Sequence, residues 1–412
     1  MTSHILKEGT PHEAGMDSAR LDRVRKLGAQ WVEKGETPSL VLLVARRGTI
    51  VLHEAFGVQR PEHTTSTLKR DSIFPLASCS KPLTAAAVMC LVEDGLIGLN
   101  RPLIDYIAEW DVPGVQWLDE LLVADLLCHT SGIDDLALGA HIQAAAARSP
   151  DLPPAGPGQH PKLSARIHLA AGAPLARRPG EVLMYSNFGF NLLADMVRRV
   201  SGQPFWQFVQ SRIFKPLGMQ DSSFVFPPEL LERRVYRAPG MPSTQPVPGL
   251  HTGIDSPDFD ELDLGSGGAA STAWDVAVFL QMLLNGGSYD GQRILSPAGV
   301  RAITTPQIDP STPVIQPLIN PLTGKRIEVE FRGGGYGLGM YILSAGDRFS
   351  ANGSLASHTG FGHMGYSGAY FWADPESEVI GVFLSVVPRL IHDMPARNSD
   401  LFMNAVHAAI VD

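Results

Sequence analysis

A serine and a lysine three positions apart form the most reactive pair in this chain. Ser78 and Lys81 stand near the start of an apolar stretch, FPLASCSKPLTAAAVMCLVEDGLIG, which runs from residue 74 to 98. A serine hydroxyl becomes an effective nucleophile when a neighbouring group takes its proton, and a neutral lysine amine can do so. Burial and a helix N-terminus both disfavour the ammonium form, so both lower the pKa of such a lysine. The pair therefore points to acyl transfer through a covalent serine intermediate.

Pro82 indicates where the helix that carries this pair begins. Proline lacks an N–H group and is tolerated in the first turn of a helix, which predicts a helix from Ser78 to about Glu93. Gly95 follows as the residue that ends it. Residues three apart lie on the same helical face, so the hydroxyl and the amine should meet. Backbone N–H groups at the helix start could also hold a developing oxyanion.

The neighbouring Cys79 and Ser80 point elsewhere on this helix and are interpreted as spacers. Cys79 also lacks the nearby histidine that a cysteine nucleophile requires. Taken alone, the short S-x-x-K pattern also fits a structural reading, in which Ser78 caps the helix and Lys81 is solvated. The pattern needs support from other parts of the chain.

The elements that would position the site predict an α+β architecture. Strand patterns occur near both chain ends, which predicts one antiparallel sheet built from residues 1–99 and 331–412 and flanked by helices. Residues 100–330 read as an inserted, mainly helical domain with long Pro/Gly-rich loops at 149–162 and 236–268, and the active site is expected between the two domains. The expected elements are a helix over 16–34, strands Ser39–Arg46, Ile50–Ala55, Tyr336–Leu343, Gly368–Trp372 and Val379–Val386, and a helix over Asn398–Val411.

Composition excludes several classes of function. The chain has 412 residues and a net charge of −9 without a run of basic residues, so we expect no nucleic-acid partner. It has three cysteines and no C-x-x-C or H-E-x-x-H pattern, so we expect no disulfide framework, no metal and no cofactor. The N-terminus has no apolar signal region, and no apolar stretch of about 18 residues could span a membrane. We therefore expect a cytoplasmic protein with no membrane partner, and the pattern does not indicate an oligomeric state.

The motif around the serine resembles the active-site start of class C β-lactamases and their relatives. The pattern F-x-x-A-S-x-[ST]-K covers Phe74 to Lys81. The relatives include family VIII carboxylesterases, D-amino-acid peptidases and acyltransferases of the lovastatin type. Their second motif, Y-x-N, is matched by Tyr185-Ser186-Asn187. The resemblance implies a β-lactamase-like fold, a proton relay through Tyr185, and an Asn187 that orients Lys81 or the substrate.

The third motif of this family, H-x-G or K-T-G on an edge strand, has two candidates, His363-Met364-Gly365 and His358-Thr359-Gly360. In the family an Asp in an aromatic-x-Asp-Pro string lies eleven residues after the histidine, and Asp374 has that spacing from His363. His363 and Gly365 are therefore assigned to the motif, and His358 to a loop near the site. Tyr366 would then supply the second oxyanion N–H beside that of Ser78.

Two further matches support the resemblance. Leu126–Gly132 (LLCHTSG) is similar to a structural turn of the family that is not catalytic. Ser266–Asp275 (SGGAASTAWD) is similar to a segment that borders the family's pocket.

The resemblance implies a serine hydrolase in which Lys81, helped by Tyr185, takes the proton of Ser78. A histidine rather than a lysine at the third motif, together with the missing signal region, favours a carboxylesterase-like enzyme acting on a small-molecule ester. The alternatives are a D-amino-acid peptidase or amidase, an acyltransferase, and a β-lactamase or penicillin-binding activity. The alternative that is not an enzyme is a catalytically silent binding protein of the same fold.

Overall fold

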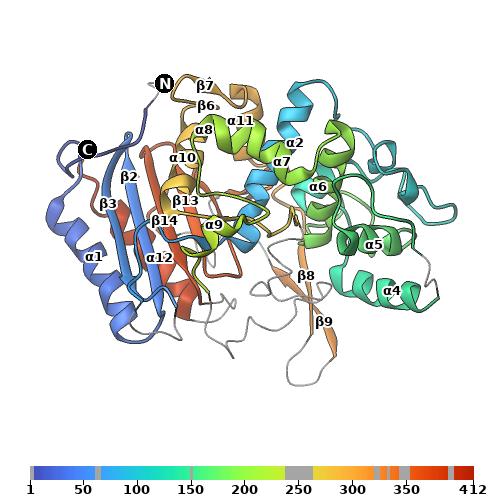
Figure 1. Cartoon of the computed structure of the whole chain (residues 1–412), viewed down its shortest axis with the longest axis horizontal. Helices are drawn as coiled ribbons and strands as arrows, with labels where there is room; N and C mark the ends of the chain where they lie inside the picture. The colour runs from blue at the N-terminus through green and yellow to red at the C-terminus, as the bar shows by residue number, and fades with distance from the viewer. Residues whose placement is uncertain are drawn as a thin grey trace.

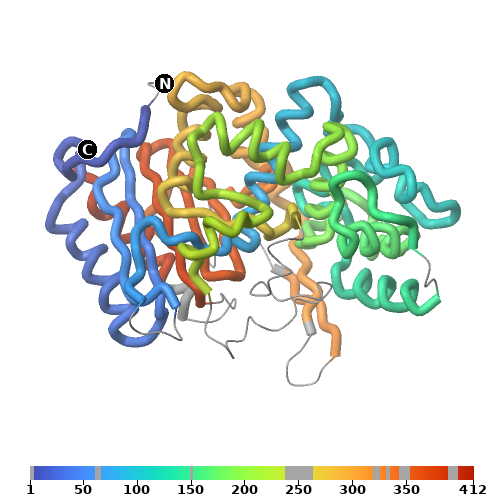
Figure 2. Tube along the Cα trace, viewed as in Figure 1, coloured from blue at the N-terminus to red at the C-terminus, as the bar shows by residue number. Residues whose placement is uncertain are grey.

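The computed structural model places a mixed sheet beside a block of helices (Figure 1). A part of the chain near each end contributes to the sheet, as predicted, and strands from the two ends lie side by side (Figure 2). The structure describes residues 4–60, 66–148, 152–236, 263–319, 325–331, 335–342, 353–387 and 394–412.

Within the described residues the sheet has eight strands, in the order β1-β3-β2-β14-β13-β12-β11-β10. All neighbours are antiparallel except β1, which pairs with β3 in parallel, so the prediction of a purely antiparallel sheet was wrong at this edge. The strands are β1 (Lys7–Glu8), β2 (Ser39–Arg46), β3 (Thr49–Gly57), β10 (Gly335–Tyr336), β11 (Tyr341–Ile342), β12 (Phe361–Met364), β13 (Tyr370–Asp374) and β14 (Val379–Ser385).

Alternating side chains of β2 face two separate apolar layers. Leu40, Leu42 and Val44 join the core beneath α1 (Ser18–Glu33) and α12 (Met394–His407), which contact each other. The alternate residues of the strand belong to the larger core that includes α2 (Lys81–Glu93) and α10 (Ala273–Leu284). This period of two is what buries both faces of the sheet.

The helical block covers most of residues 103–304, and α10 differs from the rest of it. Although α10 lies inside the segment expected to form the helical domain, it packs against β2, β13 and β14 of the sheet. The other helices are α3 (Val123–Cys128), α4 (Asp135–Arg148), α5 (Pro161–Ala170), α6 (Asn187–Ser201), α7 (Phe205–Val209), α8 (Lys215–Leu217), α9 (Pro228–Leu231) and α11 (Pro297–Thr304), with 3₁₀ turns at Ala77–Ser80, Leu103–Asp105 and Ala108–Trp110 and a π-helical turn at Gln210–Phe214.

Short strands also occur within residues 100–330, the segment expected to be helical. Among the described residues there are three two-stranded ribbons, and in one of them β5 (Ala270–Ser271) pairs with β4 (Phe74–Pro75), which lies before that segment and leads directly into the serine turn. The other two are β6 (Ser288–Tyr289) with β7 (Gln292–Arg293), and β8 (Val314–Ile319) with β9 (Arg326–Phe331).

Two predictions for the C-terminal strands were wrong. The segment expected as one strand, Tyr336–Leu343, forms a hairpin over its described part, up to Ile342: β10 turns back into β11 because Gly339 adopts a φ of +73° that few other residues tolerate. The strand β12, which carries His363, is not at the edge, since β11 and β13 pair with its two sides. Most of the loop expected at 236–268 and part of the loop at 149–162 lie outside the described residues.

No helix in the described ranges is both long and apolar enough to cross a membrane.

Candidate active site

Ser78 lies in a 3₁₀ turn, Ala77–Ser80, that continues directly into α2. Pro82 occupies the first turn of α2 and Gly95 lies just past its end with a φ of +75°, which confirms both predicted boundary signals. Ala77, the residue before the serine, has a φ of +47°, a left-handed conformation that is costly for a residue with a Cβ atom. This turn leaves Ser78 partly exposed while its neighbours are buried.

Lys81 has no exposed surface. Burial lowers the pKa of its amine from 10.5 to about 7, although the carboxylate of Asp135 partly opposes this shift. A substantial fraction of Lys81 is therefore neutral at pH 7, which a general base requires.

Three oxygen atoms surround the Lys81 amine. Its Nζ lies 2.8 Å from the carbonyl oxygen of Ser266, 2.9 Å from Asn187 Oδ1 and 3.1 Å from Ser78 Oγ. Two of these, the carbonyl and amide oxygens, can only accept hydrogen bonds. If the amine is neutral, these two oxygens can accept hydrogen bonds from both of its N–H groups. The remaining lone pair is then left for the serine hydroxyl.

Tyr185 completes the group around the serine. Its phenol lies close enough to the Ser78 hydroxyl for the serine to favour the phenolate, and its ring centroid lies 4.7 Å from Lys81 Nζ. Burial raises the pKa of Tyr185 well above its usual value of 10, so the phenol keeps its proton. The structure thus brings Ser78, Lys81, Tyr185 and Asn187 together, as the motifs predicted.

Asp135 is a carboxylate at this site that the motifs did not indicate. It accepts hydrogen bonds from Ser186 Oγ at 2.6 Å and from the backbone N–H of Asn187 at 2.7 Å. A negative group at the start of a helix is favourable, because unpaired N–H groups point there. Asp135 therefore holds the first turn of α6, and with it the Tyr185–Asn187 motif, in position.

Cys79 and Ser80 are anchors, which corrects their interpretation as spacers. Cys79 Sγ lies 3.3 Å from the carbonyl oxygen of His363 and links the serine turn to β12. Ser80 Oγ accepts a hydrogen bond of 3.0 Å from the backbone N–H of Ala269. These contacts place the serine turn between the third-motif strand and the segment that offers the Ser266 carbonyl.

The third-motif candidates lie in different environments. His363 is buried on β12, whereas His358 is exposed in the turn that precedes this strand. Both ring nitrogens of His363 are engaged within the protein, with Tyr336 and with the carbonyl of Met364. Direct binding of substrate by the His363 ring remains a prediction from the motif.

Gly365 brings the end of β12 against the serine turn. A Cβ atom at this position would lie 2.1 Å from the carbonyl oxygen of Leu76, so only glycine allows this approach. The next residue, Tyr366, thereby lies close to the turn that carries Ser78. This closeness is compatible with the oxyanion role predicted for the Tyr366 N–H.

We expect the substitution Gly365→Ala to lower kcat for an ester about a hundredfold, the effect typical of losing one oxyanion donor. The added methyl group must push the backbone of β12 away from Leu76. The matched control is Gly189→Ala in α6, where the nearest atom to the new Cβ lies at 3.4 Å. Steady-state kinetics of both variants check this, and wild-type kcat in Gly365→Ala would contradict it.

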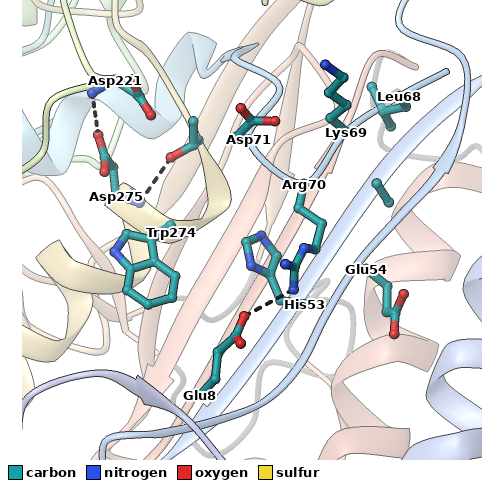
Figure 3. Close-up of a pocket in the computed structure, with 12 residues that line it drawn as sticks. Glu8, His53, Glu54, Leu68, Lys69, Arg70, Asp71, Asp221, Trp274 and Asp275 are labelled. Atoms are coloured by element: carbon teal, nitrogen blue, oxygen red, sulfur yellow. Dashed lines mark hydrogen bonds and ion pairs between the residues drawn. The ribbon is translucent and has the colours of Figure 1, made fainter. Parts of the chain in front are cut away.

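A separate cavity of about 610 Å³ lies beside β3 (Figure 3). Two of the contacts within its lining join Arg70 to Glu8 at 3.1 Å and the backbone N–H of Asp221 to the accepting carboxylate of Asp275 at 2.9 Å. None of Ser78, Lys81 and Tyr185 lines this cavity, so it is distinct from the serine centre. Its lining is Glu8, His53, Glu54, Ala55, Leu68, Lys69, Arg70, Asp71, Asp221, Thr272, Trp274 and Asp275.

Comparison with known proteins identifies the family. The family model described as Beta-lactamase matches residues 23–400. Protein Rv1367c of Mycobacterium tuberculosis (strain H37Rv) is 29% identical over 340 residues, covering 77% of this chain and 78% of that protein. A putative D-alanyl-D-alanine carboxypeptidase of Escherichia coli K12 is 24% identical over 421 residues, covering 97% and 89%. The solved structure of EstCE1, "a hydrolase with promiscuous acyltransferase activity", shares the fold with a TM-score of 0.73 and 21% identity, covering 96% of this chain and 99% of that one. The chain therefore belongs to the Beta-lactamase family of serine hydrolases.

Proposed function

We propose that this protein hydrolyses small-molecule carboxylic esters through an acyl-enzyme on Ser78. The observation that carries the proposal is the surroundings of Lys81 Nζ, which lies within hydrogen-bond distance of two obligate acceptors and of Ser78 Oγ. When the amine is neutral and its two N–H groups occupy those acceptors, its lone pair is left for the Ser78 hydroxyl. A base aimed at the hydroxyl in this way is the requirement for a serine nucleophile.

In the proposed reaction Lys81 takes the proton of Ser78 as Oγ attacks the ester carbonyl. The backbone N–H groups of Ser78 and Tyr366 would hold the oxyanion of the tetrahedral intermediate. Tyr185 would give its proton to the departing alkoxide and regain one from Lys81. Water then attacks the acyl-enzyme by the reverse of these transfers, which releases the acid and restores Ser78.

The third-motif position supports an ester over a carboxylate-bearing β-lactam or peptide. Burial and the nearby charge of Lys81 lower the pKa of His363 to about 3, so its imidazole is neutral at pH 7. A neutral, fully engaged ring offers no cation to attract a substrate carboxylate. EstCE1 is described as a hydrolase that also transfers acyl groups, and one relative is named a carboxypeptidase, so acyl transfer and peptide hydrolysis are the competing reactions to be tested.

A panel of substrates tests the choice. It contains p-nitrophenyl esters of graded acyl length, nitrocefin, and a D-alanyl p-nitroanilide, each also assayed with an added alcohol acceptor. We expect the short esters to have the highest kcat/KM and water to be the main acceptor. A higher kcat/KM for nitrocefin or for the anilide would overturn the ester proposal and favour a β-lactamase or an amidase.

The pH dependence of ester hydrolysis should report the protonation of Lys81. Its pKa in the folded protein is lowered to about 7, and the protonated form, which dominates below that pH, cannot accept the proton of Ser78. We therefore expect kcat/KM to rise about tenfold per pH unit below 7 and to level off above it. Initial rates measured at the isosbestic wavelength of p-nitrophenol check this. A profile that is flat or falls between pH 6 and 8 would contradict the assignment.

A further inference from the structure

We propose that His129 and Tyr336 are positioning residues, which hold the phenol of Tyr185 in place through a buried chain of directed hydrogen bonds. This inference deepens the proposed function and rests on it, since Tyr185 is the group that would relay the proton. It also assigns a role to the histidine of the LLCHTSG segment, which the sequence indicated only as a structural turn.

The chain of hydrogen bonds begins at the residue after Tyr185. The backbone N–H of Ser186 donates to His129 Nδ1 at 3.1 Å. His129 Nε2 lies 3.1 Å from the Tyr336 hydroxyl, which in turn lies 3.2 Å from Nε2 of His363. This series of hydrogen bonds ends at Nδ1 of His363, which lies 2.8 Å from the carbonyl oxygen of Met364.

The backbone groups at the two ends of this series determine which atom donates in every hydrogen bond between them. A backbone N–H can only donate, so His129 Nδ1 carries a lone pair and its proton is on Nε2. A backbone carbonyl can only accept, so His363 carries its proton on Nδ1 and its Nε2 accepts. The Tyr336 hydroxyl then accepts from His129 and donates to His363. The two histidines are thus neutral and in opposite tautomers.

Burial keeps the imidazoles neutral. His129 and His363 are each 1% exposed, and burial together with the charge of Lys81 lowers the pKa of both rings. Both ring nitrogens of each histidine and the Tyr336 hydroxyl have hydrogen-bond partners within the protein. A buried network that is fully satisfied is rigid, because any displacement leaves a buried polar atom without a hydrogen bond.

This rigidity is passed to Tyr185 by direct contact. The His129 ring lies against the Tyr185 ring, with centroids 4.1 Å apart and planes inclined by 33°. His129 also ends α3 with a φ of +60°, which directs its side chain from the turn into this contact. Tyr336 is held from its other side by an edge-on contact with Tyr341 at 4.9 Å.

The substitution Tyr336→Phe tests the proposal, since it removes one hydroxyl and keeps the ring. We expect kcat for a p-nitrophenyl ester to fall about tenfold to a hundredfold with little change in KM, because small displacements of a catalytic group have effects of this size. The matched control is Tyr289→Phe, which removes a hydroxyl that accepts from the backbone N–H of Leu6 at 3.2 Å. The control should keep wild-type kcat. Equal kcat in both variants would overturn the inference.

Substitutions of His129 separate positioning from packing. Asparagine suits a left-handed position, and its Oδ1 can replace Nδ1 as acceptor for the Ser186 N–H. We therefore expect His129→Ala to have the lower kcat and His129→Asn to recover part of the loss. If both variants have wild-type kcat and only a lower Tm, the residue serves stability alone and the inference fails.

Nitrogen-15 NMR of the imidazole rings in the wild-type protein measures the tautomers directly. We expect the proton of His129 on Nε2 and that of His363 on Nδ1 at pH 7, and the same tautomer in both rings would overturn the network. This result does not depend on turnover. Labelling of Ser78 by a fluorophosphonate separates the remaining cases: an unlabelled wild-type protein refutes the proposed function, whereas a labelled Tyr336→Phe variant with wild-type kcat refutes only the positioning role.

Discussion

The substitution Ser78→Ala should lower kcat/KM for a short-chain p-nitrophenyl ester by at least about a thousandfold, because the acyl-enzyme can no longer form. The fold should be preserved. Ser78 is partly exposed, and its hydroxyl contacts only site residues, Lys81 and Tyr185, among the described partners. Steady-state kinetics and thermal unfolding together check this prediction.

The matched control for this variant is Ser80→Ala, two positions along the same turn. Ser80 Oγ accepts one buried hydrogen bond from Ala269, so we expect a stability loss of about 1 kcal/mol and kcat within a few-fold of wild type. If Ser80→Ala were inactive and Ser78→Ala active, the nucleophile would be misassigned.

Substitution of Lys81 should have an effect as large as that of Ser78, for a different reason. Arginine keeps the positive charge but stays protonated at all accessible pH values, so Lys81→Arg has no lone pair for the Ser78 proton. Lys81→Met lacks the amine altogether. We expect both variants to lose about a thousandfold in kcat/KM, and the rise of activity through pH 7 to disappear.

Lys26→Met is the control for a change of charge without a change at the site, since Lys26 is exposed on α1. It should keep the wild-type pH profile. A Lys81→Arg variant that retained more than about a tenth of wild-type kcat/KM would show that charge, and not proton acceptance, is the contribution of this residue.

Local patterns were sufficient where an element is long and its apolar pattern is unbroken. The strand β2 has the predicted bounds because it is a continuous apolar run that is buried on both faces. The helix α1 begins and ends within two residues of the predicted bounds because its buried residues recur at helical spacing along its length. The start of α2 was predictable for a similar reason, since Pro82 restricts the backbone by itself.

The C-terminal strands were harder to predict because their partners are distant in sequence. The apolar segment after Tyr336 looks like one strand, but Gly339 reverses the chain. Tyr336 lies in the first strand of this hairpin. Its place in the hydrogen-bond network depends on the hairpin, which the apolar period of the segment does not predict. Likewise, the interior position of β12 depends on pairing with β11 and β13, which short strands do not specify alone.

The proximity of four candidate site residues was predictable because their side-chain types and spacing fit one chemistry. Ser78, Lys81, Tyr185 and Asn187 are recognised by residue type and spacing, and the structure brings them within contact distance. The carbonyl oxygen of Ser266 was not predictable, since every residue has a backbone carbonyl and only the fold selects this one. The role of His129 was missed because the turn it ends explained its presence without reference to the ring.

Reaction with a fluorophosphonate probe, followed by mass spectrometry of the intact protein and of its peptides, tests the central claim most directly. We predict one phosphonyl group per chain, on Ser78, formed faster as the pH rises through 7 and absent from Ser78→Ala. A wild-type protein that stays unlabelled, or that carries the label on Ser80 or another residue, would contradict the assignment of Ser78 as the nucleophile.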